Sequence, residues 1–162
     1  EVYFDIISKK TASLLASCCG IGAMSTTDND QVLEQVSEIG MNLGIAFQIK
    51  DDLFDYGDNN VGKPTGIDIV EKKMTLPLIY ALESASKDKR RKVLKLIKKS
   101  KKSKSEVKDV VQFVIASGGL EYGQQKMEEF QQKALHGLRE LQSESSPEYL
   151  IALINYVIER KK

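Results

Sequence analysis

The sequence of 162 residues is poor in the residues that mark several classes of protein. It contains two cysteines, one histidine, three prolines and no tryptophan. The two cysteines, Cys18 and Cys19, are adjacent, which excludes a disulfide framework and a CxxC site. Because thiols without a disulfide partner are typical of a reducing interior, the expected location is the cytoplasm.

A large net charge and a long apolar run are also missing. The 24 Lys and Arg side chains almost balance 23 Asp and Glu side chains, so the overall charge does not identify a partner. The most apolar early stretch, Leu14 to Met24, is too short to span a bilayer, and neither a transmembrane segment nor a signal peptide is predicted. The length suffices for one domain with a hydrophobic core.

Apolar residues recur at helical spacing along nearly the whole chain, and strand-like alternation is absent. We therefore predict an all-α helical bundle. The expected helices span residues 2–22, 31–57, 69–85, 88–100, 105–117, 119–142 and 147–160. Three signals mark helix boundaries: a cap within Asp28 to Asp30, a break at Gly118-Gly119, and a start at Ser146-Pro147-Glu148.

Three aspartates stand together on one of these helices, in Phe47-Gln48-Ile49-Lys50-Asp51-Asp52-Leu53-Phe54-Asp55. At about 100° per residue, Asp51 and Asp55 lie on one face, and Gln48 and Asp52 form a second i, i+4 pair. The other faces are apolar and favour burial, so the polar stripe is expected to line a cleft. Crowded carboxylates there must take up protons, meet Lys or Arg, or hold a cation, and oxygen ligands favour magnesium.

The alternative for these aspartates is an exposed acidic helix end or a capping device. The basic residues nearby favour the metal. Lys63, Lys72 and Lys73 follow closely, and Lys10-Thr11 lies on an earlier helix, so acids and bases occur in the amounts that a metal-bound diphosphate needs. The irregular stretch Gly57 to Asp68 is expected to do chemistry or to gate it.

Residues 87–108 are strongly basic, and this segment has two interpretations. One is a surface for nucleic acid or an anionic membrane. The other is a solvated helical hairpin with its own apolar face, formed by Val93, Leu94, Leu96 and Ile97. Because no aromatic residues interleave with the lysines, the hairpin is favoured and no nucleic-acid partner is predicted.

In their order along the chain, these motifs resemble those of the trans-polyprenyl diphosphate synthases, all-helical enzymes that join isopentenyl diphosphate to an allylic diphosphate. Lys10-Thr11-Ala12-Ser13-Leu14 resembles the family's Lys-Thr helix, and residues 47–55 resemble its second aspartate-rich motif. Gly62-Lys63-Pro64-Thr65-Gly66-Ile67-Asp68 is similar to the glycine-lysine loop that follows. Lys73-Met74-Thr75-Leu76-Pro77-Leu78 is similar to the start of the next helix.

By matching position, the resemblance implies a role for each motif residue. The residues are the magnesium ligands Asp51, Asp52 and Asp55, the diphosphate contacts Lys10, Lys63 and Lys73, and the substrate-facing residues Thr11, Phe47 and Gln48. Lys10, Thr11, Gln48 and Lys63 would act in catalysis. The family usually has Gly at the position of Lys72, so whether Lys72 or Lys73 reaches the phosphate stays open.

The family's first aspartate-rich motif and its nearby arginines have no counterpart here. The chain therefore resembles only the C-terminal portion of one synthase domain, and we expect residues 1–162 to be a fragment that is inactive alone. Product length depends on residues near the missing motif and is not predicted. The resemblance further implies a lipid product and a homodimer for the full-length enzyme.

Two other functions were considered beside a prenyltransferase. A non-catalytic regulatory or partner subunit would keep the fold, but it has no need of an intact aspartate triplet and Lys63. A terpene-cyclising or head-to-head relative would differ in a simple observation, namely whether isopentenyl diphosphate is consumed.

Overall fold

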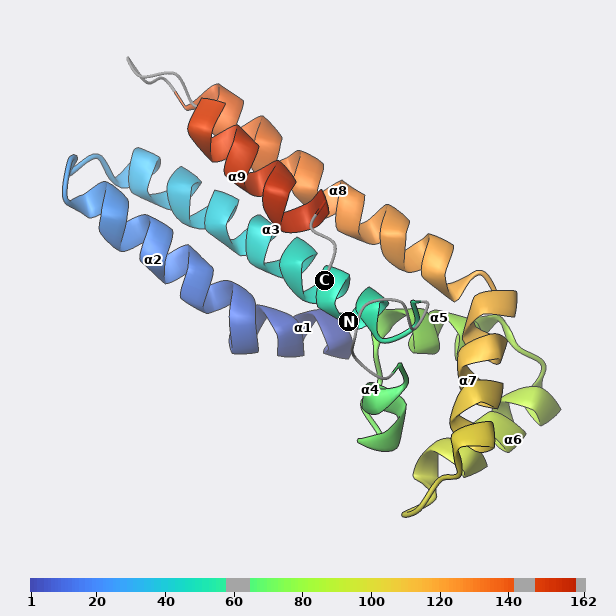
Figure 1. The fold of residues 1–162 in the computed structure, drawn as a ribbon. Coiled ribbons are helices and arrows are strands. Elements are labelled where there is room, and N and C mark those ends of the chain that lie inside the picture. Colours follow the sequence, from blue (N-terminus) through green and yellow to red (C-terminus); the bar gives the residue numbers. More distant parts are fainter. Residues whose placement is uncertain (58–64, 142–147, 160–162) are drawn as a thin grey trace. The chain divides into compact units, whose positions relative to one another are not determined.

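The computed structural model describes residues 1–57, 65–141 and 148–159. No strand occurs in these ranges, which confirms the predicted all-α class (Figure 1). None of the helices in them combines the length and apolar composition that a membrane span needs. The elements are α1 (Val2–Ile7), the π-helix η1 (Ser8–Ala12), α2 (Ser13–Met24), α3 (Asp30–Phe54), α4 (Ile67–Val70), α5 (Leu76–Ser84), α6 (Lys87–Lys98), α7 (Lys104–Ala116), α8 (Gly119–Glu140) and α9 (Glu148–Glu159).

The predicted helix over residues 69–85 is wrong, because the chain forms two helices there, α4 and α5. Lys72 lies between them with a φ of 61°, in the left-handed region that stops a right-handed helix. Thr75 is extended, and Pro77 occupies the first turn of α5. The expected helix 2–22 is also interrupted, since its middle turn is the π-helix η1.

Local signals set the other boundaries much as expected. The side-chain oxygen of Asn29 accepts a hydrogen bond from the backbone N–H of Gln31 at 3.0 Å, which confirms the cap at Asp28 to Asp30. Gly118, with a φ of 74°, separates α7 from α8. Ser103 and Glu106 form a reciprocal capping box at the start of α7. Residues 142–147, which include Ser146-Pro147, lie outside the described residues.

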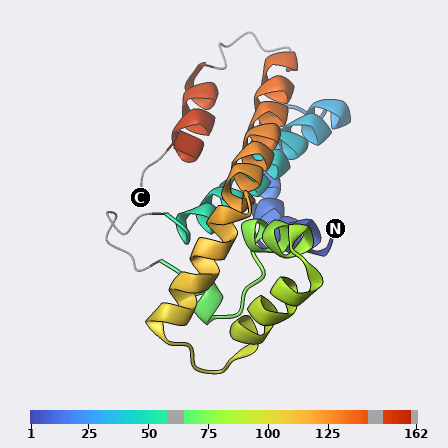
Figure 2. The same ribbon diagram turned by 90° about the vertical axis from the view of Figure 1, so that its right-hand side faces the viewer.

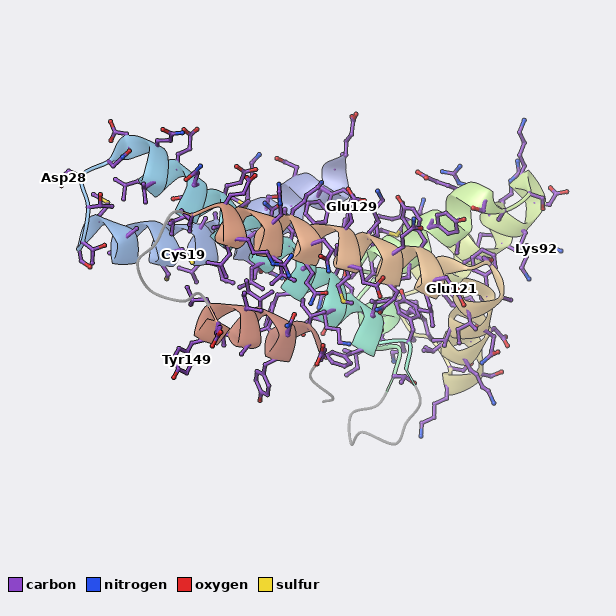
Figure 3. The ribbon with its side chains drawn as sticks, turned by 90° about the horizontal axis from the view of Figure 1, so that it is seen from above. Cys19, Asp28, Lys92, Glu121, Glu129 and Tyr149 are labelled. Atoms are coloured by element: carbon purple, nitrogen blue, oxygen red, sulfur yellow. The ribbon has the colours of Figure 1, made fainter. Side chains whose placement is uncertain are left out.

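One compact unit contains residues 1–50 together with the chain from Lys126 through α9. In it α2 and α3 run side by side, as Figure 1 shows. Their backbones approach closely, since a Cβ on Gly40 of α3 would lie 2.9 Å from the Cα of Ala16 on α2. A cluster between α3, α8 and α9 forms its core: Ile39, Ala134, Leu135, Leu138 and Ile154. The outer side of α9 is exposed, and Tyr149, labelled in Figure 3, is 90% exposed.

A second compact unit contains residues 51–125. Helices α6 and α7 form a hairpin within it, which confirms the predicted hairpin (Figure 2). The core of this unit combines residues from the segment after α3, α4, α5 and both hairpin helices: Tyr56, Ile69, Leu78, Ala81, Leu82, Val93, Ile97, Val110, Val111, Phe113 and Val114. The hairpin is therefore held by its own apolar face, and its charged face is exposed.

Replacing Lys72 by glycine is expected to stabilise the protein by about 1 kcal/mol, because glycine adopts positive φ without the steric cost that a Cβ brings. Lys72 is exposed, so its side chain contributes little packing. Denaturant unfolding of Lys72→Gly against the parent measures the difference. Lys72→Ala is the matched control and should show no such gain, because alanine keeps the Cβ. Equal stability of the glycine and alanine variants would contradict the expectation.

Candidate functional site

The aspartate-rich segment lies at the C-terminal end of α3. Asp51 and Asp52 are within the helix, and α3 ends at Phe54, so Asp55 lies in the turn that follows and not in the helix predicted to residue 57. Three backbone bonds between residues three apart tighten this end, including Asp55 N–H to the Asp52 carbonyl at 3.3 Å. Asp52 and Asp55 are buried, and Asp51 is partly exposed.

Asp55 holds the chain that returns after the loop. Its Oδ1 accepts a hydrogen bond from the backbone N–H of Ile67 at 2.9 Å, and its Oδ2 accepts one from Asp68 at 3.1 Å. Its carbonyl accepts a third from Gly66 at 2.9 Å. The carboxylate therefore caps the first turn of α4 from twelve residues earlier in the chain. These bonds fix the orientation of the Asp55 carboxylate.

Asp68 extends this network to Lys73. The Nζ of Lys73 lies 2.9 Å from Oδ1 of Asp68 and 2.7 Å from Oε2 of Glu71. The hydrogen bonds to Glu71 and then to Asp68 raise the pKa of Lys73, so the ammonium stays charged at neutral pH. The side chain is half exposed. Lys73, expected to contact a diphosphate, is thus paired with two carboxylates, which accept hydrogen bonds from two of the three N–H donors of its ammonium group.

Tyr56, which follows the aspartates, is hydrogen-bonded to Thr75, which precedes α5. Both side chains are 3% exposed, and the hydroxyl oxygens of Tyr56 and Thr75 lie 2.5 Å apart. Burial raises the pKa of Tyr56, the hydrogen bond to Thr75 opposes that rise, and the nearby carboxylates add to it. Tyr56 is therefore a neutral phenol. The pair connects the end of α3 to the start of α5 across nineteen residues.

Thr11 and Gln48, predicted to face the reacting carbons, lie together in the first unit. The hydroxyl of Thr11 donates to Oε1 of Gln48 at 3.0 Å, in a partly buried position. Lys10 and Thr11 belong to the π-helix η1, and π-helical turns occur frequently at functional sites. Lys10 is exposed and has no ion-pair partner among the described residues. Phe47 is partly buried on α3, next to Gln48.

Sequence reasoning assigned no role to the residues that support the aspartates: Tyr56, Gly66, Asp68 and Thr75. Gly66 has a φ of 83° and is buried, so its role is a backbone one. No local pattern pairs Asp55 with residues 66–68 or Tyr56 with Thr75, because each pair is joined across a loop and not along one helix. Lys63, the remaining predicted residue, lies outside the described residues.

Within the part of the chain that the structure describes, no three His, Cys, Asp or Glu side chains converge as a group that could hold a metal ion. The available donors are carboxylate oxygens, which favour magnesium or calcium over softer-ligand metals. Magnesium commonly takes only one or two protein carboxylates and completes its shell with water and phosphate oxygens. Asp51, Asp52 and Asp55, the predicted ligands, supply carboxylate oxygens of this chemical kind at the end of α3.

Comparison with known proteins shows one consistent family. The family described as polyprenyl synthetase matches residues 1–114. A geranylgeranyl diphosphate synthase of Sulfolobus acidocaldarius is 34% identical over 100% of this chain and 50% of its own length. The chain spans about half the length of such curated relatives.

Two solved structures give the same result. The geranylgeranyl pyrophosphate synthase of Bacteroides thetaiotaomicron is 36% identical with a TM-score of 0.89, covering 98% of this chain and 53% of that one. The polyprenyl synthase of Caulobacter crescentus, in complex with calcium and isoprenyl diphosphate, is 29% identical with a TM-score of 0.88, covering 99% and 50%. The described helices therefore share the all-α fold of these synthases.

Proposed function

Because this chain belongs to the polyprenyl synthetase family, we propose that it supplies the allylic-diphosphate site of a magnesium-dependent prenyltransferase. The observation that carries the proposal is the end of α3. Asp51 and Asp52 stand there in the last turns of the helix, and the Asp55 carboxylate anchors Ile67 and Asp68 at the far end of the loop. The carboxylates proposed to hold the metal are thereby hydrogen-bonded to the backbone at Ile67 and Asp68, which follow Lys63 in the family motif.

The reaction would break the bond between the allylic carbon and its diphosphate and form a bond to the terminal alkene carbon of isopentenyl diphosphate. A proton is then lost, with the released diphosphate as its acceptor. When bound, magnesium would neutralise the negative charge that develops on the departing diphosphate. Asp51, Asp52 and Asp55 are the residues proposed to hold it. The related Caulobacter crescentus structure contains calcium with isoprenyl diphosphate, which supports a divalent ion here.

The lysines would bind the same anion. Lys10 is exposed and unpaired among the described residues, and Lys73 stays charged because of Asp68 and Glu71. Lys63 is proposed as the third contact from its position in the family motif. Three ammonium groups and magnesium together would offset the charge of a diphosphate, which favours departure of that group over simple ground-state binding.

Thr11 and Gln48 would face the carbon that becomes cationic, and Phe47 would contact the prenyl chain. The hydrogen bond from Thr11 to Oε1 of Gln48 fixes the amide oxygen in one orientation. Neutral oxygen dipoles stabilise a carbocation without the strong nucleophilicity of a carboxylate. A His or Cys base is not needed, since the diphosphate itself accepts the proton.

The whole synthase's partners are part of the proposal, because the chain covers half of its relatives' length. We propose isopentenyl diphosphate as the second substrate, a homodimer as the assembled state and a lipid as the product. The free thiols of Cys18 and Cys19 support a cytoplasmic location. A regulatory partner subunit is the alternative function, and the retained aspartates argue against it.

The test is a hybrid enzyme in which this chain replaces the aligned half of the Sulfolobus acidocaldarius synthase. We expect the folded hybrid to consume isopentenyl diphosphate only when both an allylic diphosphate and magnesium are present. Removal of magnesium with a chelator should stop the reaction, and returning it should restore activity. A folded hybrid that binds allylic diphosphate but never consumes isopentenyl diphosphate would favour the regulatory alternative.

In this hybrid, Lys73→Ala is expected to weaken binding of the allylic diphosphate about tenfold, because one charge-assisted contact is lost. Lys72→Ala is the matched control and should change binding less than twofold. Titration with a non-hydrolysable thio-analogue of the allylic diphosphate measures both. If Lys72→Ala has the larger effect, Lys72 is the phosphate ligand and the pairing of Lys73 with Asp68 and Glu71 is structural.

A further inference from the structure

Helix α6 carries an exposed basic face that the proposed reaction does not use. Five cationic side chains form this face around Leu94: Lys87, Arg90, Arg91, Lys95 and Lys98. All five are exposed, and no ion-pair partner is found for any of them among the described residues. Asp88 is the single acidic residue of the helix. We call these five cations with Leu94 the α6 basic face.

The buried side of α6 fixes the orientation of the α6 basic face. Val93 and Ile97 are 4% and 3% exposed and belong to the core that α6 shares with α7. At about 100° per residue the five cations occupy an arc of about 140°, whose centre lies about 110° around the helix from that of Val93 and Ile97. Leu94 lies within this arc, partly buried and packed against the same core, in a shallow hollow of about 370 Å³. The helix therefore presents cations around one apolar contact.

Neighbouring cations are engaged within the molecule, in contrast to those of the α6 basic face. Lys99 pairs with Glu106, and the Nζ of Lys102 donates to the carbonyls of Val70 and Lys99 at 3.3 and 3.1 Å. The Nζ of Lys89 lies 5.7 Å from the centre of the Phe113 ring. Lys92, labelled in Figure 3, borders the groove between α6 and α7. Lys89, Lys99 and Lys102 are thus engaged in contacts within the protein, whereas no ion-pair partner is found for the five cations of the α6 basic face among the described residues.

We propose that the α6 basic face docks this protein onto the anionic headgroups of a lipid bilayer. Groups of four to eight Lys and Arg residues on an amphipathic helix bind acidic lipids, with attraction that adds up over the cations near the surface. The part of Leu94 that is not packed against the core adds a small apolar contact between these cations. The face contains no Asn or Gln to read base edges and no aromatic ring to stack on bases, which disfavours nucleic acid. The proposal does not depend on the catalytic one.

Vesicle sedimentation tests the proposal with the purified chain. We expect binding to phosphatidylcholine vesicles that contain about 30 mol % phosphatidylglycerol, none to pure phosphatidylcholine, and loss of binding as salt rises from about 0.1 to 0.5 M. The triple variant Arg90→Gln, Arg91→Gln, Lys95→Gln should bind on the order of 100-fold more weakly. The control variant Lys104→Gln, Lys133→Gln, Arg139→Gln removes the same charge elsewhere and should bind like the parent.

A fluorescent reporter gives a second, independent readout, because the chain has no tryptophan. Leu94→Trp should show a blue shift with the anionic vesicles, whereas Tyr156→Trp on the exposed side of α9 should not. Circular dichroism checks that each variant is folded. The proposal is overturned if the parent does not bind anionic vesicles or if the two triple variants lose binding equally. It is also overturned if a DNA or RNA oligonucleotide displaces the protein from the vesicles and binds it more tightly.

Discussion

Replacing Asp51 by alanine is expected to lower turnover of the hybrid synthase on the order of 1000-fold, while the helical fold stays intact. The loss corresponds to about 4 kcal/mol of transition-state stabilisation, the range that a metal at a departing anion provides. Asp51 is partly exposed, so removing its carboxylate leaves no large cavity. Steady-state kinetics at several magnesium concentrations measure the effect, and the variant should require more magnesium than the parent.

Substitution of Asp51 tests the metal site more directly than substitution of Asp55, because the two carboxylates have different structural roles. Asp55 accepts backbone hydrogen bonds from Ile67 and Asp68, so its loss would also disturb α4. Asp88→Ala is the matched control for Asp51→Ala: it removes one exposed carboxylate from the same unit and should leave turnover unchanged. Near-normal turnover in a folded Asp51→Ala variant would refute the assignment of the metal to this end of α3.

Replacing Gly66 by alanine should destabilise the protein by about 3 kcal/mol and lower its melting temperature by about 10 °C. Two effects add. The backbone has a φ of 83°, where a residue with a Cβ is strained. The new Cβ would also lie 2.3 Å from Cγ1 of Val107 on α7, which must move. Thermal and denaturant unfolding measure the loss.

Two further variants serve as a control and as a separation of the backbone strain from the collision with Val107. Gly22→Ala, on α2, has nothing within 4 Å of the new Cβ and should stabilise the protein by about 1 kcal/mol. Adding Val107→Ala to Gly66→Ala removes the collision but keeps the backbone strain. The double variant should therefore be less unstable than the sum of the two single changes. If Gly66→Ala unfolds like the parent, both the positive φ and the contact with Val107 are wrong.

The helices of this protein could be predicted because their signals are local. The apolar spacing of α6 and α7 gave the hairpin, Gly118 gave the break before α8, and residues 28–30 gave the cap of α3. Each depends on residues within a turn or two of one another. The family resemblance rested on motif order, which is also a property of sequence.

The sequence by itself determined an all-α chain with a conspicuous group of aspartates, and it singled out Lys10-Thr11 and Gln48. Tertiary structure alone decided that Asp55 leaves α3 to cap α4, that Lys73 pairs with Asp68 and Glu71, and that α4 and α5 are separate helices. Helical periodicity reports which faces are buried, but it carries no information on which partner a polar group meets after the chain has turned. Those choices depend on hydrogen bonds and ion pairs that form only once the folded chain brings the groups together.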